Sequence, residues 1–196
     1  MSIRSEAALE AQLIVLAFKS SGFMTALQAA RSLKLSSWCI GAGAVRNLVW
    51  DHLHGFKTET PAEDIDVVFF DASNLSQEFE RAINDRLTLA EPGFNWEAVN
   101  QAGVHRWVQS HATQVGQPFR SLAEGIASWP EVATCVGVTL SGSGEIEVIA
   151  PHGLTDLFEM IVRRNPSRVS SAVFTQRVAK KRFAERWPQV RVLEAS

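Results

Sequence analysis

The sequence predicts an α+β (α/β) domain with a mixed β-sheet flanked by helices. Short segments rich in β-branched and aromatic residues alternate with longer segments whose apolar residues recur every three or four positions. Turns of small residues separate these segments, and 46% of the 196 residues are hydrophobic, which suits one domain with a sizeable core. We therefore expect residues 1–196 to form a single domain with three parts.

The first part, residues 1–35, is expected to be a pair of helices. Apolar residues at helical spacing run through residues 6–19, and a second such run extends from Phe23 to Leu33. Ser21 and Gly22 separate the two runs. The chain is therefore expected to begin with a helical hairpin.

The second part, residues 36–112, alternates strands with helices. A short apolar strand, Ser37–Ile40, leads into a turn of glycine and alanine, and Gly55 is placed to end the helix that follows. The remaining expected elements of this part are a helix at Val45–Leu53, a strand at Ile65–Phe70, a helix at Leu75–Leu89, a strand at Asn95–Val99 and a helix at Gln101–Gln109. The run from Ile65 to Phe70 is apolar enough for a strand that is buried on both faces.

The third part, residues 113–196, combines a hairpin with helices. The turn Ser141-Gly142-Ser143-Gly144 separates two segments of strand-like composition. The expected elements are a helix at Leu122–Ala127, strands at Thr134–Leu140 and Glu145–Ile149, and helices at Gly153–Val162 and Ser171–Arg186.

Charge and cysteine usage restrict the possible classes of protein. A net charge of −2 argues against a broad nucleic-acid-binding surface, because many phosphate contacts need an excess of Lys and Arg. Cys39 and Cys135 both lie among apolar residues, so we expect buried free thiols rather than a disulfide. We find no signal peptide and no apolar run of membrane-spanning length, so a cytoplasmic protein without a membrane partner is expected.

Asp64 and Asp66 form the first candidate site. Residues two apart on a strand point to the same face, so these two carboxylates are expected to converge. Like charges at close range repel strongly unless a cation lies between them, and Mg²⁺ prefers oxygen ligands of this kind. An acidic pair exposed to water at the end of a strand is the alternative, and the pair alone does not decide between them.

The small-residue turn Gly41-Ala42-Gly43-Ala44 lies between the preceding strand and helix. This layout directs backbone N–H groups and a helix N-terminus towards an anion, and glycine lets a phosphate approach closely. The turn matches neither the dinucleotide-binding Gly-x-Gly-x-x-Gly pattern nor a Walker Gly-Lys-Ser/Thr motif. Tight packing would explain the turn by itself, but its combination with a downstream Asp-x-Asp is more selective.

The segment Ile40-Gly41-Ala42-Gly43-Ala44-Val45-Arg46-Asn47 resembles the opening motif of the DNA polymerase β-like nucleotidyltransferase superfamily, with Asp64-Ile65-Asp66-Val67 as its Asp-x-Asp. The chain is also similar to one bacterial family of nucleotidyltransferase-like proteins within that superfamily. That resemblance rests on four blocks, which are Ala42–Asp51, Glu63–Asp71, Trp96–Ala102 and Ala150–Leu157. It covers most of the chain except the first helices and implies the nucleotidyltransferase fold, with residues 36–112 as the catalytic core.

The resemblance implies an active site with three acidic metal ligands. Asp64 and Asp66 take the first two places, and Glu97 is the best match for the third, with Mg²⁺ or Mn²⁺ as the cofactor. The implied nucleotide-binding residues are Gly41, Ala42, Gly43, Ala44, Arg46 and Asn100. The implied reaction transfers a nucleoside monophosphate from an NTP to a hydroxyl acceptor, which is a small molecule, an RNA end or a protein, and releases pyrophosphate.

Two positions depart from the patterns of these families. Ala42 stands where the superfamily more often has glycine, and Gly103-Val104-His105 lacks a basic residue that the closer family often has there. A non-catalytic nucleotide-binding or interaction module that retains the fold is therefore the alternative function. The sequence does not indicate the nucleobase, the acceptor or the oligomeric state.

Several other polar residues have a structural and a functional interpretation. The side chains of His52 and His54 point in different directions on a helix, which argues against a zinc site. His105 is more typical of a structural histidine than of a proton carrier. Asn100 is also suited to capping the following helix, as is Gln101. Asp71 is expected to cap a turn.

The tryptophans and the C-terminal cations complete the candidates. Most of the six tryptophans, including Trp50, Trp96 and Trp107, are expected in the core, and base stacking by one of them remains open. One basic cluster comprises Arg163, Arg164, Arg168, Arg177, Lys180, Lys181, Arg182 and Arg186. A solvated helix face is the usual reason for such a cluster, and a docking surface for an RNA end or a nucleotide is the alternative.

Overall fold

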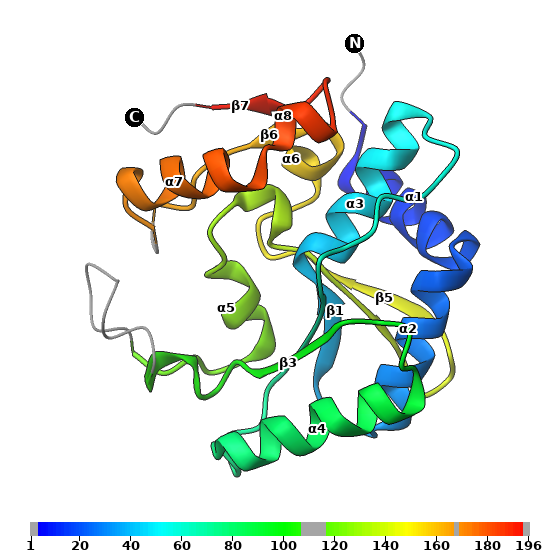
Figure 1. Cartoon of the computed structure of the whole chain (residues 1–196), viewed down its shortest axis with the longest axis vertical. Coiled ribbons are helices and arrows are strands. Elements are labelled where there is room, and N and C mark those ends of the chain that lie inside the picture. The colour runs from blue at the N-terminus through cyan, green and yellow to red at the C-terminus, as the bar shows by residue number, and fades with distance from the viewer. Residues whose placement is uncertain (1–3, 107–116, 167–168, 194–196) are drawn as a thin grey trace.

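The computed structural model describes residues 4–106, 117–166 and 169–193. Figure 1 shows a central sheet with helices on both of its faces and a small C-terminal layer at one end. The helices are α1 (Glu6–Lys19), α2 (Ser21–Ser32), α3 (Ala42–His54), α4 (Gln77–Ala90), α5 (Leu122–Ala127), α6 (Thr155–Phe158), α7 (Ser171–Lys181) and α8 (Phe183–Arg186). The strands are β1 (Trp38–Gly41), β2 (Ile65–Phe69), β3 (Trp96–Asn100), β4 (Gly137–Leu140), β5 (Ile146–Ile149), β6 (Ile161–Val162) and β7 (Arg191–Val192).

The central sheet has five strands in the order β3-β2-β1-β4-β5. β2 and β3 run parallel, whereas β1 is antiparallel to both β2 and β4, and β4 is antiparallel to β5. The expectation of a mixed sheet flanked by helices is therefore confirmed.

The two faces of the sheet have different coverings. On β2, Val67 and Phe69 belong to the main core, which also contains the buried residues of α1, α2, α3 and α4. Val68 points to the other face and packs against Leu122 and Ile126 of α5. α5 is short, so it covers only part of this second face. Asp66 lies on the same side of β2 as Val68, because side chains alternate along a strand.

The two N-terminal helices form as expected, but their axes are bent by 91° from one another. Ser20 ends α1 and begins α2, and its hydroxyl accepts a hydrogen bond from the Phe23 amide at 3.1 Å. This serine N-cap explains why one helix follows the other without a loop. Among the described residues no single helix is long and apolar enough to cross a membrane; α1 and α2 pass that test only as a bent pair.

The turn expected at residues 41–44 is not a loop. β1 includes Gly41, and α3 begins immediately at Ala42, whose φ of 50° lies in the left-handed region. The strand therefore passes into the helix through one left-handed residue, with no separate loop between them. A Cβ on Gly41 would lie 2.5 Å from the ring of Trp129, which explains why glycine occupies this position.

The prediction of a helix at Gln101–Gln109 is wrong for the residues that the structure describes. Residues 101–103 form turns, and Val104–Arg106 form a short 3₁₀ helix, while residues 107–109 lie outside the described residues. The Gln101 amide donates to the carbonyl of Phe69 at 2.7 Å, so the chain continues its pairing with β2 at this point. That interstrand bond replaces the start of a helix.

The C-terminal part differs most from expectation. The helix expected at Gly153–Val162 is confined to α6, because Met160 takes a φ of 53° and the chain then enters β6. β6 pairs in parallel with β7 and forms a second sheet that the sequence does not predict. Arg182, with a φ of 51°, likewise divides the expected last helix into α7 and α8. The first hairpin strand begins at Gly137 rather than Thr134.

Candidate active site

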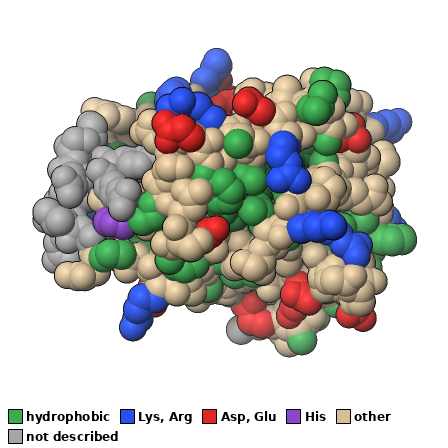
Figure 2. Space-filling model, turned by 90° about the horizontal axis from the view of Figure 1, so that it is seen from below, with side chains coloured by type: hydrophobic (Ala, Val, Ile, Leu, Met, Phe, Trp, Pro, Cys, Tyr) green, Lys and Arg blue, Asp and Glu red, His purple; other side chains and the backbone are tan. Residues whose placement is uncertain are grey.

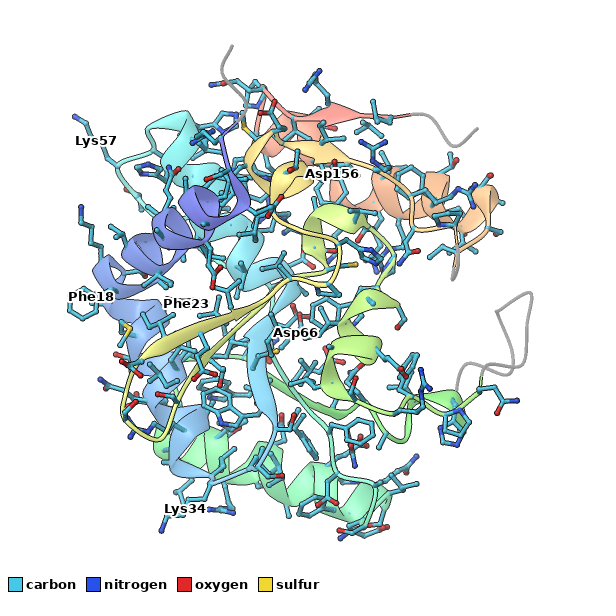
Figure 3. All side chains as sticks on the ribbon, turned by 180° about the vertical axis from the view of Figure 1, so that it is seen from behind. Phe18, Phe23, Lys34, Lys57, Asp66 and Asp156 are labelled. Carbon is cyan, nitrogen blue, oxygen red and sulfur yellow. The ribbon has the colours of Figure 1, made fainter. Side chains whose placement is uncertain are left out.

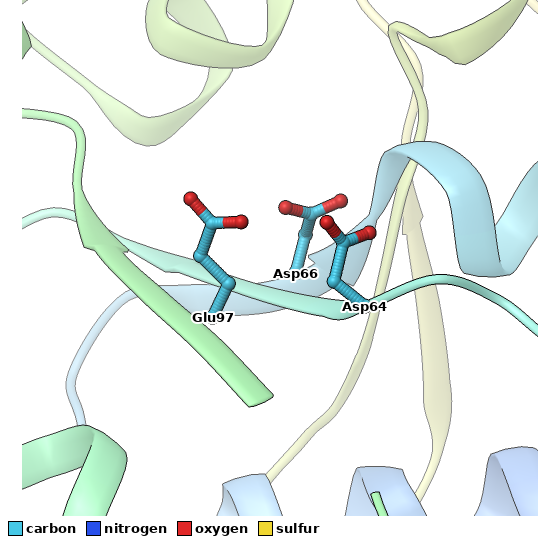
Figure 4. A group of neighbouring side chains, drawn as sticks. All are labelled: Asp64, Asp66 and Glu97. Carbon is cyan, nitrogen blue, oxygen red and sulfur yellow. The ribbon is translucent and has the colours of Figure 1, made fainter. Parts of the chain in front are cut away.

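The acidic residues Asp64, Asp66 and Glu97 meet at the start of the two parallel strands. Asp66 on β2 is the registered partner of Glu97 on β3, and Asp64 immediately precedes β2. One carboxylate oxygen from each residue lies within 4.8 Å of the others. Figure 4 shows the three side chains rising from the strands towards the same side. Three hard oxygen donors at this separation fit a divalent cation such as Mg²⁺.

Burial and mutual repulsion shift the proton affinities of this cluster. Burial, followed by the charges of Asp64 and Glu97, raises the pKa of Asp66 to about 7. The pKa of Glu97 is also raised, first by burial and then by the charge of Asp64. Lys181 opposes both shifts, and Arg46 opposes that of Asp66. A bound dication would remove the repulsion and favour the ionised carboxylates.

Raising the pH from about 4 to about 7 is expected to destabilise the metal-free protein. The Asp66 carboxyl has a pKa of about 7 in the folded chain and 3.8 as its ordinary value, so the folded state binds more protons between these values. The free energy of unfolding then falls as the pH rises, by up to about 4 kcal/mol. Thermal unfolding in a chelator at several pH values measures this slope. Asp66→Asn should reduce it, and an equal slope in both proteins would contradict the argument.

Two acids of the cluster, Asp64 and Asp66, line a cleft of about 320 Å³. Figure 3 places Asp66 beside the sheet in the middle of the molecule. Residues from five parts of the chain line the cleft, namely Ala42, Gly43, Arg46, Asp64, Asp66, Val68, Val99, Gln101, Trp129, Pro130, Glu131, Thr134, Arg177 and Lys181. Its size suits a small ligand, and its walls carry both acids and bases.

The N-terminus of α3 forms one wall of the cleft. Ala42 and Gly43 line it, and no side chain caps the first amides of this 13-residue helix. Uncapped amides at a helix N-terminus favour an anion, both through hydrogen bonds and through the helix dipole. This wall of the cleft therefore has the polarity that a phosphate requires.

Arg46 adds a positive charge to the same wall. Its guanidinium lies 5.2–5.6 Å from the ring centroids of Trp50, Phe183 and Trp187, and it donates to Asn47 Oδ1 at 2.8 Å. Its buried Nε has no hydrogen-bond partner. Burial lowers the pKa of Arg46 to about 10, which leaves it charged at neutral pH. The aromatic rings hold the Arg46 side chain in place, and the remaining side of the guanidinium faces the cleft.

Some lining residues come from segments that sequence reasoning did not connect with the acids. Glu131 is almost fully buried, and it accepts hydrogen bonds from Arg177 Nε at 2.8 Å and Nη2 at 3.3 Å. Trp129 packs against Gly41, and the half-buried Lys181 contacts Glu63 at 2.8 Å. Nothing in the sequence near Trp129 or Glu131 points to a site. Arg177 and Lys181 were part of the predicted basic cluster.

Three of the residues expected to bind nucleotide do not line the cleft. Gly41 lies beneath Trp129, and Ala44 faces a separate cavity on the other side of α3. The Asn100 side chain is buried: its oxygen accepts from the amides of Asp71 and Ala102, and its nitrogen donates to the carbonyls of Asp71 and Asn74. These bonds tie β3 to the loop after β2, so the structure gives Asn100 a structural role.

The remaining polar candidates have mainly structural surroundings. His54 hydrogen-bonds the carbonyl of Trp50 and the amide of Gln189, and Asp71 caps a turn at Ser73. His52 is exposed, and the buried His105 Nδ1 has no partner. Trp50 and Trp96 are core residues as expected, whereas Trp107 lies outside the described residues. Cys39 and Cys135 are buried free thiols, as expected.

The predicted basic cluster divides between two places. Arg177 and Lys181 line the cleft, while Arg186 lies 3.6 Å from Glu63, the residue before Asp64. Arg163 pairs instead with Asp156, which Figure 3 shows at the end of the molecule formed by the C-terminal elements. Arg168 lies outside the described residues. Figure 2 shows basic side chains scattered over one face among acidic and apolar ones, in keeping with the nearly balanced charge.

A family model described as nucleotidyltransferase matches residues 28–192, which is most of the chain. The protein belongs to this nucleotidyltransferase family. Among solved structures, the chain is similar to a CCA-adding enzyme head domain determined by NMR, with 26% identity and a TM-score of 0.78 over 94% of this chain and 96% of that one. No curated protein matches the sequence.

Two further solved structures, both of CCA-adding enzymes, share the fold of this nucleotidyltransferase. One, from Thermotoga maritima, was solved in complex with tRNA, and it has 14% identity and a TM-score of 0.54 over 95% of this chain. The other was solved with CTP, at 14% identity and a TM-score of 0.55 over 94% of this chain. The chain spans only 42% and 43% of their lengths. The expected nucleotidyltransferase fold is thereby confirmed.

Proposed function

We propose that this protein transfers a nucleoside monophosphate from an NTP to a hydroxyl acceptor and releases pyrophosphate, with Mg²⁺ or Mn²⁺ as cofactor. The observation that carries the proposal is the convergence of Asp64, Asp66 and Glu97 within 4.8 Å, next to a cleft that Asp64 and Asp66 share with the N-terminus of α3. Negative ligands for a cation and a positive site for phosphate thus lie in one cavity.

The chain's own residues have separable roles in this reaction. Asp64, Asp66 and Glu97 would hold the cation, which when bound neutralises phosphate charge and orients the reacting oxygens. The amides of Ala42 and Gly43, with Arg46, would bind the triphosphate. The acceptor oxygen bonds to the α-phosphorus as the bond to the bridging oxygen of pyrophosphate breaks. The hydroxyl proton would pass to water or to a carboxylate of the cluster.

The structurally similar proteins suggest which acceptor to test first. The similar head domain is described as that of a CCA-adding enzyme, and the two further CCA-adding enzymes were solved with tRNA and with CTP. An RNA 3′ end is therefore the first acceptor to test, ahead of small molecules and protein side chains. We propose the cytoplasm as its location, consistent with an RNA acceptor.

The test is transfer of labelled nucleotide from each of the four NTPs, with Mg²⁺ or Mn²⁺, to RNA ends, small hydroxyl compounds and proteins. The expected result is a labelled acceptor together with stoichiometric pyrophosphate. The alternative function, a nucleotide-binding module without catalysis, predicts tight NTP binding with no pyrophosphate for any acceptor. Absence of both NTP and metal binding would exclude both functions.

A further inference from the structure

Two cations of α7 reach into the cleft from outside the central sheet. Arg177 and Lys181 are four residues apart, so they lie on the same face of the helix, and both line the cavity that contains Asp64, Asp66 and Arg46. The adjacent Lys180 is exposed and does not line this cavity. α7 therefore presents two specific positive charges to the site.

The present partners of these two cations differ in accessibility. Arg177 pairs with Glu131, whose side chain is only 3% exposed, and loss of this pair would leave a buried carboxylate without compensation. Lys181 pairs with Glu63, whose side chain is 58% exposed. An exposed ion pair contributes little free energy, on the order of 0–1 kcal/mol. The Lys181 pair is therefore the one that a ligand can replace at little cost.

Glu63 would keep a cation if Lys181 moved away. Arg186 Nη1 lies 3.6 Å from Glu63 Oε1, and Glu63 immediately precedes Asp64. Lys181 is also close enough to Asp66 and Glu97 for its charge to act on both. Lysine has a long and flexible side chain, and Lys181 lies near the acidic cluster with a partner that can be replaced. It is therefore suited to pair with the phosphate of a ligand that binds in the cleft.

We propose that Lys181 exchanges its ion pair with Glu63 for the phosphates of the bound NTP, so that Glu63 limits nucleotide affinity by competing for the lysine. This inference rests on the proposed function and gives specific roles to two residues that the sequence analysis did not place in the active site. The phosphates of an RNA acceptor have the same chemistry. The triphosphate is the favoured source, because Lys181 shares one cavity of about 320 Å³ with Gly43, Arg46 and the two aspartates of the acidic cluster.

The test measures the affinity of α,β-methylene NTP analogues with Mg²⁺ by calorimetry, on the full chain. Lys181→Ala is expected to weaken binding about tenfold, the effect of losing a charged hydrogen bond. Lys180→Ala is the matched control and should leave affinity unchanged. Glu63→Gln should tighten binding about threefold, since it removes a weak competing ion pair. In the Lys181→Ala background, Glu63→Gln should have no such effect.

Three results would overturn the inference. The first is an equal affinity of Lys181→Ala and Lys180→Ala for the NTP analogues. The second is a gain in affinity from Glu63→Gln that persists without Lys181. The third comes from titrating a single-stranded oligoribonucleotide in the same way, and it is a loss of affinity in Lys181→Ala for this RNA but not for the analogues. In each case the wild type still binds the analogues, so the proposed function survives. A wild type that binds none of the four analogues would instead overturn the proposed function, and the inference with it. Circular dichroism checks that each variant is folded.

Discussion

Asp66→Asn is expected to lower metal-dependent nucleotide transfer by about 10³-fold or more. Asp66 lies opposite Glu97 in the β2–β3 register and beside Asp64, so it contributes to the centre of the proposed metal site. Asparagine keeps the size of the side chain and removes the charge that a dication requires, and charge stabilisation of this kind is a large part of catalysis. Initial rates with saturating NTP and acceptor measure the effect.

A gain of stability should accompany this loss of activity. Asp66 is surrounded by two like charges and is largely buried, which raises its pKa to about 7. Its ionised form therefore destabilises the metal-free fold above that pH, and Asp66→Asn should unfold at a higher temperature than the wild type at pH 8 in a chelator. The matched control is Asp85→Asn on the exposed face of α4. A variant that still binds Mg²⁺ and transfers nucleotide at the wild-type rate would contradict the assigned site.

The second large effect is expected from Asp51→Ala, which should lower the free energy of unfolding by about 3 kcal/mol. Asp51 is buried on α3, and its carboxylate accepts hydrogen bonds from the amide and hydroxyl of Thr60 and, at 2.7 Å, from Trp187 Nε1. Alanine would leave three donors without their acceptor, and unpaired buried donors cost about 1–3 kcal/mol each, less whatever water recovers. Urea unfolding measures the change.

This carboxylate joins three segments that are distant in sequence. Thr60 belongs to the loop before the acidic pair, and Trp187 follows α8 and packs on Trp50 of α3. Loss of Asp51 should therefore also loosen the C-terminal helices that place Lys181. His52→Ala is the matched control, since its side chain is exposed on the same helix. A loss of less than about 0.5 kcal/mol in Asp51→Ala would show that the three donors find other acceptors.

Much of the central sheet follows from local patterns. The apolar run at Ile65–Phe70 predicts β2 almost to the residue, and the spacing of Leu9, Leu13 and Leu16 predicts α1. Gly55 adopts the left-handed conformation expected of a residue that ends a helix. In these segments the residue pattern and the packing favour the same conformation, which explains the agreement.

Local patterns are insufficient where tertiary contacts decide the conformation. The apolar residues at Ile161–Val162 fit a helix as well as a strand, and only pairing with β7 near the end of the chain makes them a strand. Tertiary pairing also decides the conformation at Gln101, because its amide donates to the carbonyl of Phe69 instead of starting a helix. Asn100 carries an ambiguous signal, since an amide suits a nucleotide as well as a buried hydrogen-bond network.

The sequence by itself determined the Asp64–Asp66 pair, the strand-to-helix junction before it and the family resemblance, because each depends on residues close together in the chain. The resemblance suggested Glu97 as the third acid, and only the tertiary structure showed, through the parallel register of β2 and β3, that this residue meets the other two. The tertiary structure alone brought Trp129, Glu131 and two cations of α7 to the same cleft. The physical reason is that alternation and capping act over a few residues, whereas a binding cleft is formed by packing between segments far apart in the chain.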